Sequence, residues 1–298
     1  GIGMVLSLIW FWFGRAQLKG IGAPPAGYEG MGRDVMVAIV AIIAIPVSYF
    51  LLTIDAGILN WILIALFVAP AIILLVEGIR EGAVQRDMVI AMLIIFGFNV
   101  LFWMFFEQAG SSFNFLAQHI VDRQMFGGWE FPTGWFQSVN SAGILIFAPF
   151  VALAWGLLAR RRMEPSIPRK FGLGLIFNGL AFLLLMFALS SLVDPQSLKI
   201  PFWTLFMVYV IQSVGELCLS PIGLSMTTKL APVRLGGMAM GCWFLSIAIG
   251  NNLAGIFAGR VSGEGGMTVE SAHAGYTFGF YALVGSGVLL FLVAPLVN

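Results

Sequence analysis

Residues 202–225 read FWTLFMVYVIQSVGELCLSPIGLS, a run in which Glu216 is the only charged side chain. A helix needs about 20 mainly apolar residues to cross the hydrocarbon core of a bilayer, so this run is long enough to span one. A charged side chain at the bilayer centre costs about 3 kcal/mol on insertion scales, and it usually faces a water-filled cavity or a partner. The stretch therefore predicts both a membrane-embedded fold and a candidate functional residue.

The composition of the whole chain agrees with this interpretation. Of the 298 residues, 60% are hydrophobic and 10% are charged, and the mean hydropathy is +0.98. Soluble domains carry about 25% charged residues, so a soluble fold is excluded and the lipid bilayer is the expected solvent. The sequence has no basic patch with interleaved aromatic residues, so we expect no nucleic-acid partner.

Eight apolar stretches are long enough to span a bilayer as helices. They cover residues 34–54, 58–78, 88–111, 134–158, 171–191, 202–224, 236–258 and 275–297. A ninth stretch, residues 1–14, is too short to span and lacks the features of a signal peptide, so we expect it to be the end of a truncated helix. The sequence thus predicts an all-α fold, a polytopic transmembrane helical bundle that is part of a larger protein.

Basic residues are distributed unevenly between alternate loops. Arg123, Lys199 and Arg260 lie in loops on one side, whereas the other twelve of the fifteen Lys and Arg residues lie on the opposite side. Because cytoplasmic loops are enriched in Lys and Arg, the side with twelve is predicted to be cytoplasmic. The same assignment places the C-terminus in the cytoplasm.

Two of the fourteen carboxylates, Glu107 and Glu216, fall well within predicted spans. Glu216 shares one helical face with four residues at spacings of three and four, namely Tyr209, Gln212, Ser220 and Gly223. Asn99 and Trp103 precede Glu107 at intervals of four residues. Both acids are therefore candidate functional residues at membrane depth.

Other polar and small residues in the spans also fit ordinary helix packing. Amides and hydroxyls such as Gln137, Ser220, Asn251 and Asn252 can join helices through hydrogen bonds of about 0.6 kcal/mol each, and Trp243 can fill the core. Five glycines are expected to be packing positions: Gly236, Gly237, Gly241, Gly250 and Gly255. The sequence contains no nucleophile elbow, phosphate loop or metal-ligand spacing, so we expect no enzyme activity, no metal and no cofactor.

Four blocks of the sequence resemble a known family. They are FWMFFEQAGSS (102–112), FQSVNSAGILIFAPF (136–150), GELCLSPIGLSMTTKLAP (215–232) and GGMAMGCWFLSIAIGNNLAG (236–255). They are similar to the C-terminal bundle of the proton-coupled oligopeptide transporters, a branch of the major facilitator superfamily. The resemblance implies that residues 1–14 end helix six, 15–33 form a cytoplasmic linker, 34–78 form an inserted helix pair and 79–87 a cytoplasmic link. Residues 88–298 would then form the C-terminal six-helix bundle.

The resemblance also implies roles for individual residues. Glu216 corresponds to a glutamate that holds the peptide amino terminus and takes part in proton coupling, with Asn140 and Ser220 beside it. Trp243 and Phe244 correspond to a pair that lines a side-chain pocket. Trp103 and Glu107 correspond to a pair in which the acid forms part of an extracellular gate. The second acid of that gate is replaced here by Gln118 and His119, with Asp122 as a displaced candidate.

The expected function is symport of protons with di- and tripeptides across a bacterial inner membrane by alternating access, with the proton as coupling ion. The expected partners are peptides, protons, the lipid bilayer and an N-terminal helical bundle that this chain does not contain. Two alternatives stay open: a transporter of another small solute such as nitrate or a glycoside, and a non-transporting helical scaffold. An intramembrane enzyme is disfavoured because the chain offers no nucleophile and base pair.

Overall fold

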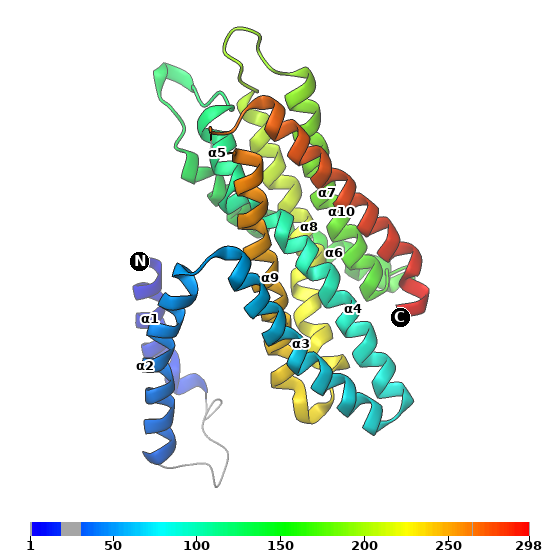
Figure 1. Cartoon of the computed structure of the whole chain (residues 1–298). Helices are drawn as coiled ribbons and strands as arrows, with labels where there is room; N and C mark the ends of the chain where they lie inside the picture. The colour runs from blue at the N-terminus through cyan, green and yellow to red at the C-terminus, as the bar shows by residue number, and fades with distance from the viewer. Residues whose placement is uncertain (1, 19–30, 264, 298) are drawn as a thin grey trace. The chain divides into compact units, whose positions relative to one another are not determined.

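The computed structural model describes residues 2–18, 31–263 and 265–297 (Figure 1). Within these residues, eight helices are long and apolar enough to cross a membrane. The prediction of an all-α, multi-pass membrane bundle is therefore confirmed. Most of the predicted linker, residues 19–30, lies outside the described residues.

The chain divides into two compact units, the first of which ends at Ile54. It contains α1 (Ile2–Gly14), a 3₁₀ turn (Arg15–Leu18) and α2 (Met31–Thr53). Most of its described side chains are exposed, as expected for apolar helices whose solvent is lipid. Of the predicted helix pair at residues 34–78, α2 belongs to this unit and the next helix begins the second unit, and their pairing stays a prediction.

The second unit, Asp55–Asn298, contains the other long helices. They are α3 (Ala56–Glu81), α4 (Ala83–Phe106), α5 (Ser112–His119), α6 (Phe136–Arg160), α7 (Ile167–Ser191), α8 (Phe202–Leu230), α9 (Gly236–Ser262) and α10 (Val269–Val297). A 3₁₀ segment, η2 (Glu107–Gly110), joins α4 to α5. The start of α3 is set by Asp55, whose carboxylate accepts hydrogen bonds from the backbone N–H groups of Gly57 (2.8 Å) and Ile58 (3.1 Å).

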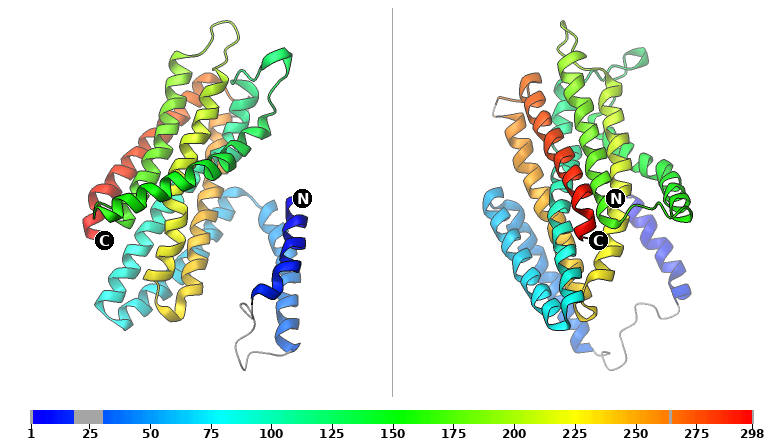
Figure 2. Two further views of the ribbon diagram at one scale, coloured as in Figure 1. Left: turned by 180° about the vertical axis from the view of Figure 1, so that it is seen from behind. Right: turned by 90° about the vertical axis from the view of Figure 1, so that its right-hand side faces the viewer.

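Helix α7 lies between α10 and α8, while α9 packs against α4 and α3. Helix α6 packs chiefly on α8, and it crosses the other helices of this unit obliquely (Figure 2). Glycines bring α7 close to both of its neighbours. A Cβ atom on Gly172 would lie 2.8 Å from the carbonyl oxygen of Gly287 on α10, and one on Gly174 would lie 3.0 Å from that of Gly215 on α8. Small residues are the usual means by which membrane helices approach closely.

The predicted packing role of the glycines on α9 holds for one of the five. A Cβ atom on Gly250 would lie 2.7 Å from the carbonyl oxygen of Val100 on α4, so this glycine is required for contact. Gly236, Gly237, Gly241 and Gly255 face open space, so the prediction is wrong for these four. The reason is that spacing alone does not show which face of α9 meets a neighbour.

Trp243 on α9 packs directly over Gly223 on α8. Its side chain is 1% exposed, and its ring lies edge-on to Phe96 (5.7 Å between centroids) and Phe171 (6.1 Å). A Cβ atom on Gly223 would lie 2.0 Å from Cη2 of Trp243. The absence of a side chain at Gly223 therefore makes room for the largest ring of the core.

We expect Gly223→Ala to destabilise the protein by about 1–3 kcal/mol, because the enclosed Trp243 ring has nowhere to move. Thermal unfolding of the purified full-length protein in detergent measures this change. The matched control is Gly241→Ala, which fills open space on α9 and should not lower the unfolding temperature. Equal unfolding temperatures for Gly223→Ala and the wild type would contradict the packing argument.

Candidate functional site

Glu216 and Asn140 meet between α8 and α6. The side-chain amide of Asn140 donates a hydrogen bond from Nδ2 to Oε2 of Glu216 (3.1 Å) and approaches Oγ of Ser213 at the same distance. Both Glu216 and Asn140 are partly buried. The two residues that the sequence analysis placed at a common site therefore lie in direct contact.

Helix α6 can come this close to α8 because Gly143 faces Ser213. A Cβ atom on Gly143 would lie 2.7 Å from Oγ of Ser213. The Ser213 hydroxyl donates to the carbonyl oxygen of Tyr209 one turn earlier (2.8 Å), and it also lies 3.3 Å from the carbonyl oxygen of Asn140. Gly143 and Ser213 thus set the separation at which the amide reaches the acid.

Glu107 lies at the break between α4 and η2, inside the candidate span Ala83–His119, which contains the predicted span over 88–111. Helix α4 ends at Phe106, and Glu107 begins the 3₁₀ segment η2. The break is held from other helices: Tyr209 Oη donates to the carbonyl oxygen of Ala109 (2.9 Å), and Gln108 Nε2 donates to that of Ala254 (3.2 Å).

Trp103 is held by a chain of polar side chains between α4 and α9. Its indole N–H donates to Oδ1 of Asn99 (3.1 Å), and Asn99 Nδ2 donates to Oγ of Ser246 (2.8 Å). Trp103 is partly buried, whereas Asn99 and Ser246 are fully buried. Asn99 therefore joins α4 to α9, and Trp103 is bonded to it from the next turn of α4.

The structure separates the residue pair that was predicted to line one side-chain pocket. Trp243 is 1% exposed within the core, whereas Phe244 is 57% exposed on the surface of α9. Adjacent residues on a helix point about 100° apart, so they do not share a face. In this structure Trp243 is a core residue, and a pocket role for either ring stays a prediction. Ser220, one turn after Glu216, is partly buried.

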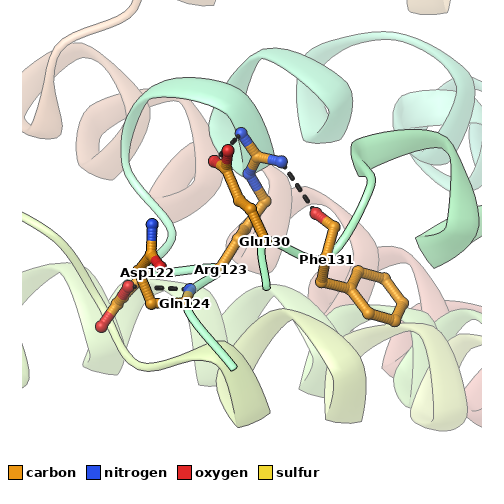
Figure 3. Close-up of polar contacts among 5 residues, drawn as sticks. All are labelled: Asp122, Arg123, Gln124, Glu130 and Phe131. Atoms are coloured by element: carbon orange, nitrogen blue, oxygen red, sulfur yellow. Dashed lines mark hydrogen bonds and ion pairs between the residues drawn. The ribbon is translucent and has the colours of Figure 1, made fainter. Parts of the chain in front are cut away.

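Asp122, the displaced candidate for the second gate acid, takes part in a loop. One of its carboxylate oxygens accepts a hydrogen bond from the backbone N–H of Gln124 (3.1 Å). Figure 3 shows the neighbouring Arg123, which pairs with Glu130 (2.6 Å) and donates to the carbonyl oxygen of Phe131 (2.8 Å). These contacts hold the connection between α5 and α6, so Asp122 has a local structural role here.

Glu216, Asn140, Ser213, Gln212 and Asn178 form a hydrogen-bonded group between α6, α7 and α8, called here the polar centre. Two of these residues, Ser213 and Asn178, were not predicted from the sequence. Ser213 lies three residues before Glu216, and that spacing could have identified it. Asn178 on α7 is fully buried and accepts a hydrogen bond from Gln212 Nε2 (2.9 Å). As an isolated Asn in an apolar span, it offered no spacing signal that pointed to Gln212. The stripe predicted on α8 is therefore split, with Gln212 bonded toward α7 and Glu216 toward α6.

A groove of about 740 Å³ runs along α6 and α8, beside the polar centre and not through it. Its walls are mostly apolar and include Val139, Ile146, Phe206, Met207 and Val210. None of the predicted site residues lines it. The contact between Asn140 and Glu216 is therefore formed between helices beside this groove, and Gly143 borders both.

This fold, with polar side chains bonded between its helices, defines a multi-pass membrane protein. Residues 1–265 match the PTR2 family, described as the POT family, and the chain therefore belongs to that family. The family resemblance noted in the sequence is therefore confirmed.

Individual relatives agree with the assignment. The peptide transporter YePEPT of Yersinia enterocolitica is 32% identical over 281 residues, which are 89% of this chain and 55% of that protein. The dipeptide and tripeptide permease A of Yersinia pestis is 30% identical over 301 residues, 99% of this chain and 58% of that protein. The chain thus spans little more than half the length of these relatives.

Solved structures give the same result. A crystal structure of peptide transporter POT in complex with sulfate aligns with a TM-score of 0.75 at 28% identity, over 99% of this chain and 60% of that one. A POT family transporter in complex with a thioalcohol-conjugated peptide aligns with a TM-score of 0.72 at 26% identity, over 100% of this chain and 62% of that one.

We expect Gly143→Ala to destabilise the protein by about 1–3 kcal/mol, because the added methyl group collides with Ser213 and pushes α6 away from α8. Ser213→Gly in the same protein should recover much of this loss, since it removes the colliding atoms. A double-mutant cycle of unfolding free energies measures the coupling. Gly156→Ala, which fills open space on the same helix, is the control. Additive effects of the two substitutions would contradict the assigned contact.

Proposed function

We propose that this chain acts in proton-coupled symport of di- and tripeptides across a bacterial inner membrane, with its C-terminus in the cytoplasm. The observation that carries the proposal is the contact between Glu216 and Asn140, which lie on two of the candidate membrane spans. Relatives named as a peptide transporter and as a dipeptide and tripeptide permease support the choice of substrate. The basic loops of one side support the orientation.

The chemistry of the substrate fits these residues. Every short peptide presents an ammonium group, a carboxylate and at least one amide, whatever its side chains are. Glu216 supplies a negative charge for the ammonium group, and Asn140 supplies an amide that can both donate and accept. Trp103, Phe244 and Trp243 are the proposed apolar contacts, with Trp243 becoming accessible only through a rearrangement of α8 and α9. Ser220 extends the polar face of α8. The positive charge for the peptide carboxylate would come from the N-terminal helical bundle.

The same acid can couple transport to a proton. A deprotonated Glu216 attracts an ammonium group, whereas a protonated one does not. Protonation therefore changes both the binding of substrate and the attraction between Glu216 and any cationic partner in the other bundle. Rocking of two bundles about a central site would then carry the peptide across, as in other transporters built from repeats. Glu107 would act in the gate on the outer side.

We expect Glu216→Gln to lower the affinity for a dipeptide roughly 10- to 100-fold, because a hydrogen bond to a charged group contributes about 1.5–3 kcal/mol. Proton-driven uptake by the full-length protein in proteoliposomes should fall to background. The assay should include competition by unlabelled dipeptide and by nitrate, since only the dipeptide should compete.

Glu81→Gln is the matched control, because Glu81 is an exposed acid in the last turn of α3. It should transport like the wild type. Unchanged uptake and unchanged peptide exchange in Glu216→Gln would show that the proposed role is wrong. Competition by nitrate and not by dipeptide would overturn the proposed substrate class.

A further inference from the structure

Two chains of hydrogen-bonded polar side chains cross the core of the second unit. The first begins at the indole N–H of Trp103, passes through Asn99 and Ser246, and ends where Ser246 Oγ donates to the carbonyl oxygen of Trp243 (2.6 Å). An indole can only donate and a carbonyl can only accept. This chain is therefore complete at both ends.

The second chain joins α4, α7 and α8 and is incomplete. Asn178 Nδ2 donates to the carbonyl oxygen of Phe102 (3.4 Å), and Asn178 Oδ1 accepts from Gln212 Nε2 (2.9 Å). The carbonyl oxygen of Phe102 can only accept a hydrogen bond, so Asn178 must turn its NH₂ group toward Phe102 and its side-chain oxygen toward Gln212. Gln212 must then donate with Nε2, so its free end is the acceptor Oε1.

That free acceptor is buried without a partner. Gln212 is 1% exposed, and its Oε1 has no hydrogen-bond partner among the described residues. A buried acceptor that lacks a donor is costly in a membrane interior, where water does not compensate. The chain therefore needs a donor at this end.

In this structure Gln212 is bonded toward α7 and Glu216 toward α6, but the two residues lie one helical turn apart, so rotation of the Glu216 side chain can bring its carboxyl group to Oε1 of Gln212. A carboxylate has no proton to donate, whereas a protonated carboxyl group donates one hydrogen bond. The free acceptor of Gln212 is therefore suited to one protonation state of Glu216 and not to the other. In the other state Glu216 accepts from Asn140 on α6.

We propose that Gln212 is a positioning residue that selects the protonated form of Glu216, by accepting a hydrogen bond from its carboxyl O–H at Oε1. This inference rests on the proposed function, in which Glu216 takes up the coupling proton. The proton comes from the aqueous medium, and no covalent bond other than O–H forms or breaks. Through Asn178 and Phe102, the protonated acid becomes the last member of a chain that joins α8 to α7 and α4.

The other ionisable groups around this part of α8 do not supply the missing donor. Glu107 lies on η2, beyond the end of α4, and the hydroxyl group of Tyr209 on α8 donates its hydrogen bond to the carbonyl oxygen of Ala109. From α7, Lys170 pairs with Glu164. Helix α6 contributes the neutral amide of Asn140, and α9 contributes Trp243 over Gly223. The remaining alternative donor is a buried water molecule.

The test is Gln212→Leu in the full-length protein, reconstituted in liposomes. Removing the acceptor should weaken proton binding by Glu216 about tenfold, because one hydrogen bond to the protonated form is lost. The midpoint of the pH profile of dipeptide uptake should therefore move about one pH unit lower. The infrared C=O stretch of the protonated carboxyl group, identified by its loss in Glu216→Gln, should move to higher wavenumber.

Tyr276→Phe is the matched control, because it removes another buried hydrogen bond, from Tyr276 Oη to Ser112 Oγ (3.2 Å), away from Glu216. It should leave the midpoint and the C=O band unchanged. If Gln212→Leu does not fold, Gln212→Met removes the same acceptor from an unbranched side chain.

The outcomes separate the two proposals. A C=O band that disappears in Glu216→Gln but does not move in Gln212→Leu overturns the role of Gln212, with water as the donor, and leaves the proposed function in place. Equal shifts in Gln212→Leu and Tyr276→Phe also overturn it, because they would show a packing effect. A pH profile unchanged in Glu216→Gln itself overturns the proposed function.

Discussion

The contact between Glu216 and Asn140 is the interaction on which the polar centre of this bundle depends. A carboxyl group inside a membrane needs a hydrogen-bond partner from the protein, because the lipid supplies none. Asn140 provides it at 3.1 Å from the neighbouring helix. Since α6 packs chiefly on α8, this contact lies in the main interface that α6 makes.

Close helix packing makes this contact possible. Helices in lipid gain no hydrophobic energy by associating, so they depend on van der Waals contact between small residues and on a few polar bonds. Gly143 allows α6 to approach α8, the pair Gly174 and Gly215 brings α7 to α8, and Gly223 accommodates Trp243. The positions of the polar side chains therefore follow from where the glycines let backbones meet.

The two acids lie on elements of different character. Glu216 is within the long helix α8, whose neighbours hold it on several sides, whereas Glu107 lies at the break between α4 and α5. That break is tied to α8 by Tyr209 and to α9 by Gln108. Both acids are therefore connected to α8, Glu216 as one of its residues and the segment of Glu107 through the hydrogen bond from Tyr209.

The sequence by itself determined the fold class, the spans and the two candidate acids, because long apolar runs and rare charges are visible in one dimension. It also indicated that Glu216 and Asn140 belong to one site, through a resemblance carried by their motifs. Only the tertiary structure decided that Gln212 bonds to Asn178, that Trp243 is buried apart from Phe244, and that α4 breaks at Glu107. The physical reason is that spacing gives the direction of a side chain around its own helix, whereas its partner depends on which helix packs against that face.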